Sequence, residues 1–157
     1  MDWNIDSGFQ KIVRYCAYQE RSRQEIMRKL DGIGCPEDKK EILVEELAAQ
    51  GFWNEDRYAR SFVRGKFRNN AWGKVKIRQG LRMKGVPEDL IQPALDEEID
   101  GDDYQATLMR EMGKKWKQDR QGIGAVDRQK LIHAMQSRGF EIQMILEIWD
   151  DWVLEDQ

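Results

Sequence analysis

Between residues 57 and 84 the chain carries a block of ten lysine and arginine residues without an aspartate or glutamate. Because a helix turns by about 100° per residue, side chains three, four and seven positions apart share one face. The spacing predicts one stripe formed by Arg57, Arg60, Arg64 and Arg68, and a second formed by Lys74, Arg78 and Arg82. Guanidinium and ammonium groups in such stripes can bind phosphates or carboxylates.

Two interpretations of this basic block compete. A charged helix face is commonly a solvated face, but solvated faces usually mix both signs in pairs one turn apart. The block contains no acid, and we therefore expect its bases to have none to pair with. We favour a docking surface for an anionic partner, which is either nucleic-acid phosphate or an acidic groove on a protein.

Aromatic residues near the basic block bear on the nature of that partner. Proteins that bind single-stranded nucleic acid place exposed aromatic rings among basic residues, so that bases stack on the rings. Phe67 and Trp72 are the candidates here. Both lie near expected helix ends in a chain whose small cores require large side chains, so we expect them to pack in the core instead.

Directly after the basic block, residues 85–104 contain eight acids and no base. Residues 96–103 share the early acids and the glycine of a calcium loop, but Thr107 stands where that loop requires a bidentate glutamate. We interpret the segment as an acidic linker between two repeated units, which also shields the basic face of the free protein. We expect no metal ion there.

Residue patterns typical of catalysis do not occur in the sequence. His133 is the only histidine, and neither an activated nucleophile nor a phosphate-binding loop accompanies it. We interpret His133 as a partly exposed structural residue. Cys16 and Cys35 lack metal-ligand spacing and are expected to be reduced thiols. The sequence therefore predicts a protein that is not an enzyme and uses no cofactor.

The chain has 157 residues and a formal net charge of -3. It contains no apolar run of about 18 residues that could cross a membrane, and its first residues lack the basic and apolar regions of a secretory signal. We therefore expect a cytoplasmic protein without membrane contact. The small net charge results from cancellation between the basic block and the acidic segments around it.

Apolar residues recur with the helical period along almost the whole chain, which predicts an all-α fold. One plan occurs three times. Residues 22–25 have the form of a capping box, and the Gly-x-Pro-Glu-Asp pattern of residues 34–38 returns at residues 85–89. The copies are aligned by Gly34, Gly85 and Gly139, and by Leu30, Leu81 and Met135 four positions earlier. We predict an elongated array of three tandem three-helix repeats, at residues 1–53, 54–100 and 101–157, in which each repeat shares its core with its neighbours.

A series of motifs in the first two repeats has a characteristic order and spacing. The series consists of residues 22–25 with Leu30, residues 51–59 with Phe62 and Val63, residues 66–68, residues 72–77, and residues 85–88 preceded by Leu81. Together these motifs resemble the RecX family of recombination regulators. The resemblance covers about residues 10 to 100, and only the helical plan continues through the third repeat.

The resemblance implies a small, non-enzymatic modulator of the RecA recombinase that binds along the groove of the RecA filament on DNA. It implies suppression of ATP hydrolysis, of strand exchange and of the filament's stimulation of repressor self-cleavage. Matching positions suggest Arg57, Lys76 and the basic residues around Trp72 as contacts. Family positions that belong to the core are Tyr58, Phe62, Ile77 and Leu81. The predicted partner-binding residues are thus Arg57, Arg60, Arg64, Arg68, Lys74, Lys76, Arg78 and Arg82.

The expected partner is the RecA filament, with DNA bound mainly through the filament and only weakly by direct contact, and the expected oligomeric state is a monomer. The slightly acidic total favours docking onto a filament of protein and DNA over general adhesion to DNA. Two alternatives stay open. One is a stand-alone helical-repeat module that binds DNA through the stripes of residues 57–84, and the other is a purely structural helical-repeat adaptor.

Overall fold

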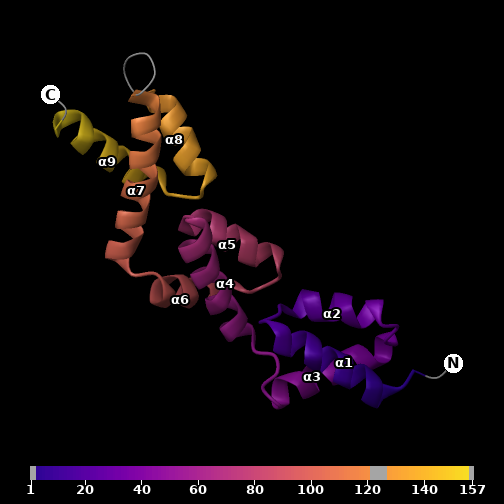
Figure 1. Ribbon diagram of the computed structural model, residues 1–157. Helices are drawn as coiled ribbons and strands as arrows, with labels where there is room; N and C mark the ends of the chain where they lie inside the picture. The colour runs from indigo at the N-terminus through magenta and orange to yellow at the C-terminus, as the bar shows by residue number, and fades with distance from the viewer. Residues whose placement is uncertain (1–2, 121–126, 156–157) are drawn as a thin grey trace.

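The computed structural model describes residues 3–120 and 127–155, with side chains described up to residue 117 in the first range. These residues form the helices α1 (Ile5–Tyr18), α2 (Arg23–Gly32), α3 (Glu37–Ala49), α4 (Glu55–Asn70), α5 (Lys74–Met83), α6 (Glu88–Glu98), α7 (Gly101–Arg120), α8 (Arg128–Ser137) and α9 (Ile142–Glu155), and no strand. Figure 1 shows an elongated molecule with α1 to α3 at one end and α7 to α9 at the other. The predicted all-α array of three-helix units is confirmed. The limits of the repeats at residues 53 and 100 stay a prediction.

The predicted helix starts are confirmed by their caps. The Ser22 hydroxyl accepts a hydrogen bond from the Glu25 amide, and the Glu25 carboxylate accepts one from the Ser22 amide, both at 3.1 Å. The Asn54 side chain accepts from the Arg57 amide at 2.8 Å. Each cap satisfies an amide that has no partner within the first turn of its helix, and so fixes where α2 and α4 begin.

The same turn ends the middle helix of each repeat. Its glycines, Gly34, Gly85 and Gly139, have φ angles of +82°, +79° and +96°, in the left-handed region that favours glycine. In each turn the amide after the glycine donates a hydrogen bond, of 2.9 to 3.1 Å, to the carbonyl of Leu30, Leu81 or Met135. These are the residues on which the three copies were aligned, so the predicted register is confirmed.

In the described residues, the hydrophobic core consists of two separate clusters of buried side chains. The first repeat has its own cluster, which includes Ile12, Ile26 and Leu47. The second and third repeats share one continuous cluster that extends from Tyr58 on α4 to Trp149 on α9. The expectation that every repeat shares its core with its neighbours is therefore wrong for the first repeat, because polar side chains occupy its junction with the second.

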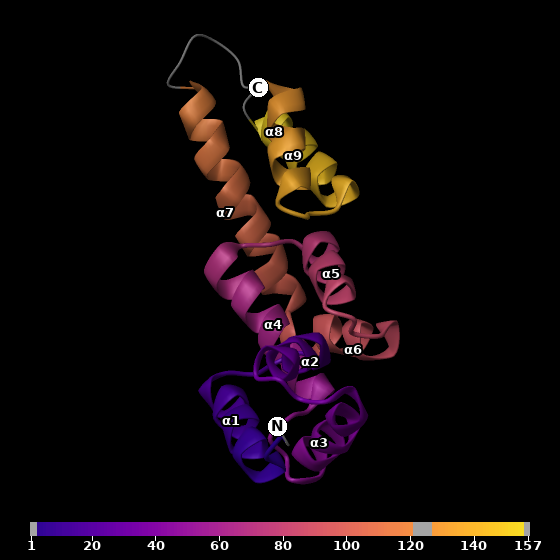
Figure 2. The same ribbon diagram turned by 90° about the vertical axis from the view of Figure 1, so that its right-hand side faces the viewer.

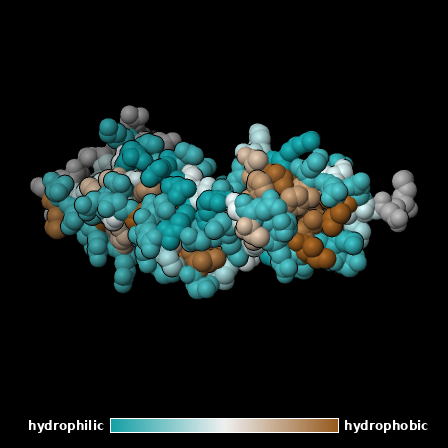
Figure 3. All heavy atoms as spheres, turned by 90° about the horizontal axis from the view of Figure 1, so that it is seen from below, coloured by the Kyte–Doolittle hydropathy of each residue, from teal (hydrophilic) through white to brown (hydrophobic). Residues whose placement is uncertain are grey.

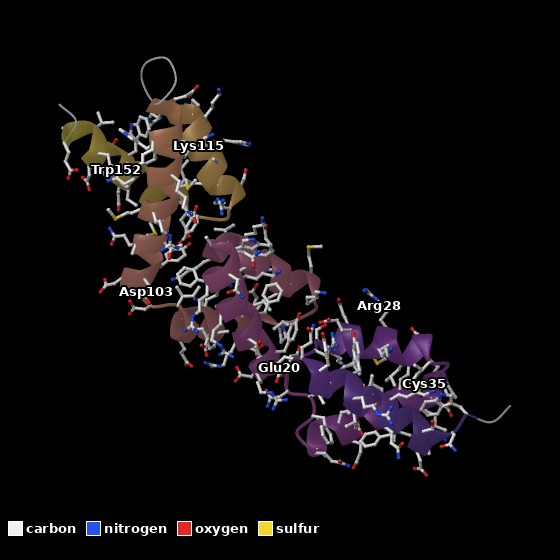
Figure 4. The ribbon with its side chains drawn as sticks, viewed as in Figure 1. Glu20, Arg28, Cys35, Asp103, Lys115 and Trp152 are labelled. Carbon is white, nitrogen blue, oxygen red and sulfur yellow. The ribbon has the colours of Figure 1, made fainter. Side chains whose placement is uncertain are left out.

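That junction between the first and second repeats is held by polar contacts. Arg57 Nε donates to the Glu20 carboxylate at 2.6 Å, and Arg57 Nη2 donates to the Gly51 carbonyl at 3.0 Å. The buried Tyr58 hydroxyl faces the capping box of α2, and its pKa is raised by burial and by the nearby Glu25 carboxylate. Figure 4 shows Glu20 between the α1 end of the first repeat and α4.

The second and third repeats are joined by backbone hydrogen bonds, which we call the backbone clasp. The Gly73 amide donates to the Arg138 carbonyl at 2.7 Å, and the Val75 amide donates to the Gly139 carbonyl at 3.0 Å. The Lys74 amide between them donates to the Tyr104 hydroxyl at 2.8 Å. Figures 1 and 2 both place the α8–α9 turn against the start of α5. The clasp therefore satisfies the first amides of α5 with acceptors from the third repeat.

Glycine is required on both sides of the backbone clasp. A Cβ atom added at Gly73 would lie 2.3 Å from backbone atoms of Gly139, and one added at Gly139 would lie 2.3 Å from the Lys76 Cβ. Such distances are far below van der Waals contact, so an added methyl group must separate the two backbones. Gly34, at the equivalent turn of the first repeat, has open space around its Cβ position.

We predict that Gly139→Ala destabilises the protein more than Gly34→Ala does. Both variants force alanine into a left-handed conformation, at a cost of about 1 to 2 kcal/mol. Only Gly139→Ala also breaks the two backbone hydrogen bonds of the clasp, which adds about 2 kcal/mol. The measurement is the free energy of unfolding in urea. Equal losses for the two variants would contradict a clasp that depends on close backbone approach.

Candidate functional site

The predicted partner-binding residues lie on two helices that pack against each other in the second repeat. Arg57, Arg60, Arg64 and Arg68 are on α4, and Lys74, Lys76, Arg78 and Arg82 are on α5. Figure 1 shows α4 and α5 in the middle of the molecule, between α1 to α3 and α7 to α9. Both predicted stripes therefore lie on the second repeat.

Five of these residues form ion pairs with carboxylates from other parts of the chain. The pairs join Arg57 to Glu20, Arg60 to Asp56, Glu97 and Glu98, Arg64 to Glu98, and both Arg78 and Arg82 to Glu88. The expectation that the block has no acid to pair with is therefore wrong. The acids are absent from the block's own sequence, but α6 packs along α4 and supplies most of them.

The acidic segment after the basic block is helical rather than an open linker. Residues 96–98 belong to α6 and residues 101–103 to α7, and the Asp100 carboxylate accepts hydrogen bonds from the amides of Asp102 and Asp103 at 3.1 Å. Glu97 and Glu98 at the end of α6 neutralise two arginines of α4. The predicted shielding of the basic face thus occurs through direct ion pairs. The described part of the chain contains no cluster of three or more metal-binding side chains.

The pKa values of the paired groups follow from these contacts. Hydrogen bonds to Glu97 and Asp56 raise the pKa of Arg60. Hydrogen bonds from Arg82 and the nearby charge of Arg78 lower the pKa of Glu88. Charges held in this way are less available to a partner, because binding must first separate the existing pair.

Three bases near the start of α5 stack on aromatic rings instead of pairing with acids. The ammonium groups of Lys66 and Lys76 lie 4.7 Å and 4.4 Å from the centroid of the Trp72 ring. We call Lys66, Trp72 and Lys76 the lysine–tryptophan cluster. Lys74 lies 4.8 Å from the centroid of Tyr104. Within the part of the chain that the structure describes, none of the three lysines forms an ion pair, so their charges are open to an anionic partner.

Phe67 and Trp72 differ in their environment. Phe67 is buried and packs against Tyr104 with ring centroids 5.9 Å apart, so the expectation of core packing is confirmed. Trp72 packs its edge against Phe62 at 6.4 Å but is only half-buried, and it carries two ammonium groups on its surface. Trp72 therefore belongs both to the edge of the core and to the candidate binding surface.

The backbone clasp positions this cluster. Lys74 and Lys76 lie in the first turn of α5, whose leading amides are bound to Arg138, Gly139 and Tyr104. These amides cannot bind an external anion, although the free start of a helix commonly does so. Anion binding at this end of α5 must therefore use the lysine side chains.

A cleft of about 460 Å³ opens beside the cluster, between the end of α1 and the outer face of α4. Lys66 and Lys84 line it on one side and Glu20 and Glu25 on the other, with the amides of Asn69 and Asn70 nearby. Such a mixed polar lining fits a loop of a protein partner better than an apolar ligand. The cleft extends the candidate surface to the polar junction with the first repeat.

Sequence reasoning missed Lys66, because this residue lies outside both predicted stripes. The signal that could have identified it is local: Lys66 follows Phe62 by one helical turn and precedes Trp72 across the helix end. The structure records this spacing as cation–π contacts of Lys66 with both rings. His133 is exposed, and Cys16 and Cys35 are free thiols as predicted, both of them buried. Burial raises the pKa of Cys16 to about 11.

The surface over these repeats is mostly polar. Figure 3 shows a largely hydrophilic face on the second and third repeats, with apolar surface gathered mainly on the first. Among the described helices, none combines the length and the apolar character needed to cross a membrane. Fold and site together define an all-α tandem-repeat protein that presents a cationic and aromatic binding surface on its middle repeat.

Comparison with known proteins identifies the family to which the chain belongs. The model of the second three-helix domain of RecX matches residues 54–95. The regulatory protein RecX of Prosthecochloris aestuarii is 30% identical over 151 residues, which cover 96% of this chain and 96% of that protein. The chain belongs to the RecX family of regulatory proteins.

Solved structures agree with this assignment. A crystal structure of a regulatory protein RecX superimposes with a TM-score of 0.82 at 26% identity, over 92% of this chain and 72% of the other. RecX from Lactobacillus salivarius superimposes with a TM-score of 0.83 at 23% identity, over 96% and 97% of the two chains. The likeness at this lower identity concerns the fold.

We predict that the contribution of Glu88 to stability depends on pH. Its pKa is lowered in the folded protein, so ionised Glu88 stabilises the fold above its unfolded pKa of about 4.5, and this contribution is lost as the pH falls through the lower folded value. The difference in unfolding free energy between wild type and Glu88→Gln should be constant from pH 6 to 8 and shrink below about pH 4.5.

The control is Glu45→Gln, which removes an exposed carboxylate of α3 that has no ion pair in the described structure. Urea unfolding at several pH values measures both variants. A difference for Glu88→Gln that does not change between pH 7 and pH 3 would contradict the proposed pairing with Arg78 and Arg82.

Proposed function

We propose that the protein is a negative regulator of RecA. In this proposal it binds in the groove of the RecA–DNA filament and lowers the filament's ATPase, strand-exchange and coprotease activities. Membership in the RecX family is the observation that carries the proposal. The elongated shape supports it, because a row of repeats offers a long side face to a filament instead of a deep pocket.

The lysine–tryptophan cluster is the part of the second repeat best suited to contact the filament. Lys66 and Lys76 carry charges without carboxylate partners, and the clasp fixes the start of the helix that bears Lys76. Among the residues predicted from the sequence, Arg68, Lys74 and Lys76 likewise form no ion pair within the described part of the chain. The paired arginines would reach a partner only after leaving their carboxylates, which costs binding free energy.

Direct binding of DNA through the predicted stripes is the weaker alternative. Salt-dependent affinity for DNA requires basic side chains that neutralise phosphates. Five of the basic side chains in the stripes are already paired with carboxylates of the same chain. The second repeat would therefore contact DNA mainly as part of the filament. The proposal includes action as a monomer in the cytoplasm.

The test of the proposal is RecA ATPase activity on single-stranded DNA during titration with the protein. We expect progressive suppression that is complete near stoichiometric ratios to the filament. Unchanged ATP hydrolysis at an equimolar ratio would sink the proposal, because a regulator of the filament must act on assembled RecA.

We predict that Lys66→Gln combined with Lys76→Gln raises the concentration for half-inhibition by about tenfold, since an exposed ion pair contributes about 0.2 to 1 kcal/mol and about 1.4 kcal/mol corresponds to a factor of ten. The matched control is Lys39→Gln combined with Lys130→Gln, which removes the same charge from α3 and α8. The same assay measures both. Equal inhibition by the two double variants would remove the cluster from the contact surface.

A further inference from the structure

The first repeat contains a second cationic surface, separate from the basic block. A cleft of about 320 Å³ between α1 and α2 is lined by four bases, Lys11, Arg14, Arg21 and Lys29, and by no acid. Figures 1 and 2 show α1 and α2 together at the N-terminal end of the molecule. This repeat is acidic by total charge, so the cleft is a local concentration of positive charge in an otherwise negative unit.

The bases of this cleft are not neutralised by the protein. In the described residues, none of Lys11, Arg14, Arg21 and Lys29 forms an ion pair with a carboxylate. This distinguishes them from five of the six arginines of α4 and α5, which pair with Glu20, Glu88, Glu97 and Glu98. Uncompensated charges gathered around one cleft raise the local concentration of anions there.

Aromatic rings are interleaved with these bases. The guanidinium of Arg21 lies 3.7 Å from the centroid of Tyr15 and 5.8 Å from that of Tyr18, and Lys29 lies 5.5 Å from Tyr15. Tyr18 is 82% exposed, which is unusual for a large aromatic side chain. Its ring is therefore available to stack on a flat ligand.

The helix geometry arranges these groups in a row. Lys11, Arg14, Tyr15 and Tyr18 are spaced at i, i+3, i+4 and i+7 on α1, so they share one face. Arg21 is held in place just after the helix, where its Nε donates to the Tyr15 carbonyl at 2.9 Å. The row is thus preorganised by the helix and by its C-terminal end.

The surface continues beyond the first cleft. A neighbouring cleft of about 310 Å³ shares Lys11 and Ile33 with it and extends to Trp3 and Asn4 at the start of α1. The two clefts together follow the length of α1. A continuous track of this kind fits an extended polymer better than a single small anion.

We propose that this surface binds single-stranded nucleic acid, with phosphates against Lys11, Arg14, Arg21 and Lys29 and a base stacked on Tyr18. Basic residues interleaved with exposed aromatic rings are the combination that single-strand binding uses, because every base has a face that can stack. An acidic polypeptide would use the charges but would leave the exposed ring without a role. The site is independent of the proposed regulation of RecA.

The experiment measures binding of a fluorescein-labelled oligothymidylate to the full chain by anisotropy, without RecA, at several salt concentrations. We expect the variant Lys11→Gln, Arg14→Gln, Lys29→Gln to bind at least about tenfold more weakly, and its slope of log affinity against log salt to be smaller by about 2, at about 0.7 for each lost phosphate contact. We expect Tyr18→Ala to weaken binding by about tenfold at an unchanged slope, because it removes stacking and no charge.

The matched control is Arg28→Gln, Lys39→Gln, Lys130→Gln, which removes the same net charge from positions outside the cleft. Circular dichroism checks that every variant is folded. Absence of oligothymidylate binding by the wild type, or equal affinities of the cleft variant and the control, overturns the proposal. It is also overturned if Tyr18→Ala binds like wild type and polyglutamate competes as well as oligothymidylate, since the site is then specific for acidic polypeptide. The anisotropy assay contains no RecA and is therefore separate from the ATPase assay. If the protein inhibits the RecA ATPase but does not bind oligothymidylate, the proposed nucleic-acid site is wrong and the proposed regulation of RecA stands.

Discussion

The close approach of Gly73 and Gly139 is the constraint on which the arrangement of the second and third repeats depends. Two backbone amides at the start of α5 donate to carbonyls at the end of α8, and no side chain fits between them. Helix ends are the points where backbone groups lack partners within the helix, so joining one start to one end satisfies both. The cluster of Lys66, Trp72 and Lys76 takes its position from this contact, because Lys76 itself packs against Gly139.

The charge pattern illustrates what could be predicted from the sequence and what could not. Helical spacing correctly put four arginines on α4, since spacing depends only on local geometry. It could not reveal that Glu97 and Glu98 meet Arg60 and Arg64, because that contact depends on how α6 packs along α4. The basic and acidic blocks of the sequence are therefore largely one ion-paired surface. Within the described residues, the bases of the block without an ion pair are Lys66, Arg68, Lys74, Lys76 and Lys84.

Other features also differ in whether they are encoded by neighbouring residues, which makes them predictable, or depend on tertiary contacts. The capping box of Ser22 and the turn glycines Gly34, Gly85 and Gly139 could be predicted, because each is encoded within a few consecutive residues. The role of Gly73 could not, since only a tertiary contact makes a side chain impossible there. The cationic cleft of the first repeat was hidden for a different reason: acids elsewhere in residues 1–56 outweigh its bases in any sum of charge, and only their placement on other faces separates the two.

The two junctions of the array differ in physical character, and this affects how its candidate surfaces act together. The second and third repeats share one core and a backbone clasp, so they behave as one unit. The first repeat has its own core and is attached by Arg57, Glu20 and Tyr58, contacts that are polar and in part screened by salt. A surface on the first repeat and another on the second are thus linked by a junction weaker than either repeat. Binding at one surface raises the effective concentration of ligand at the other only as far as this junction holds their spacing. The polar contacts of Arg57 and Tyr58 with the first repeat therefore contribute to the coupling between the two surfaces.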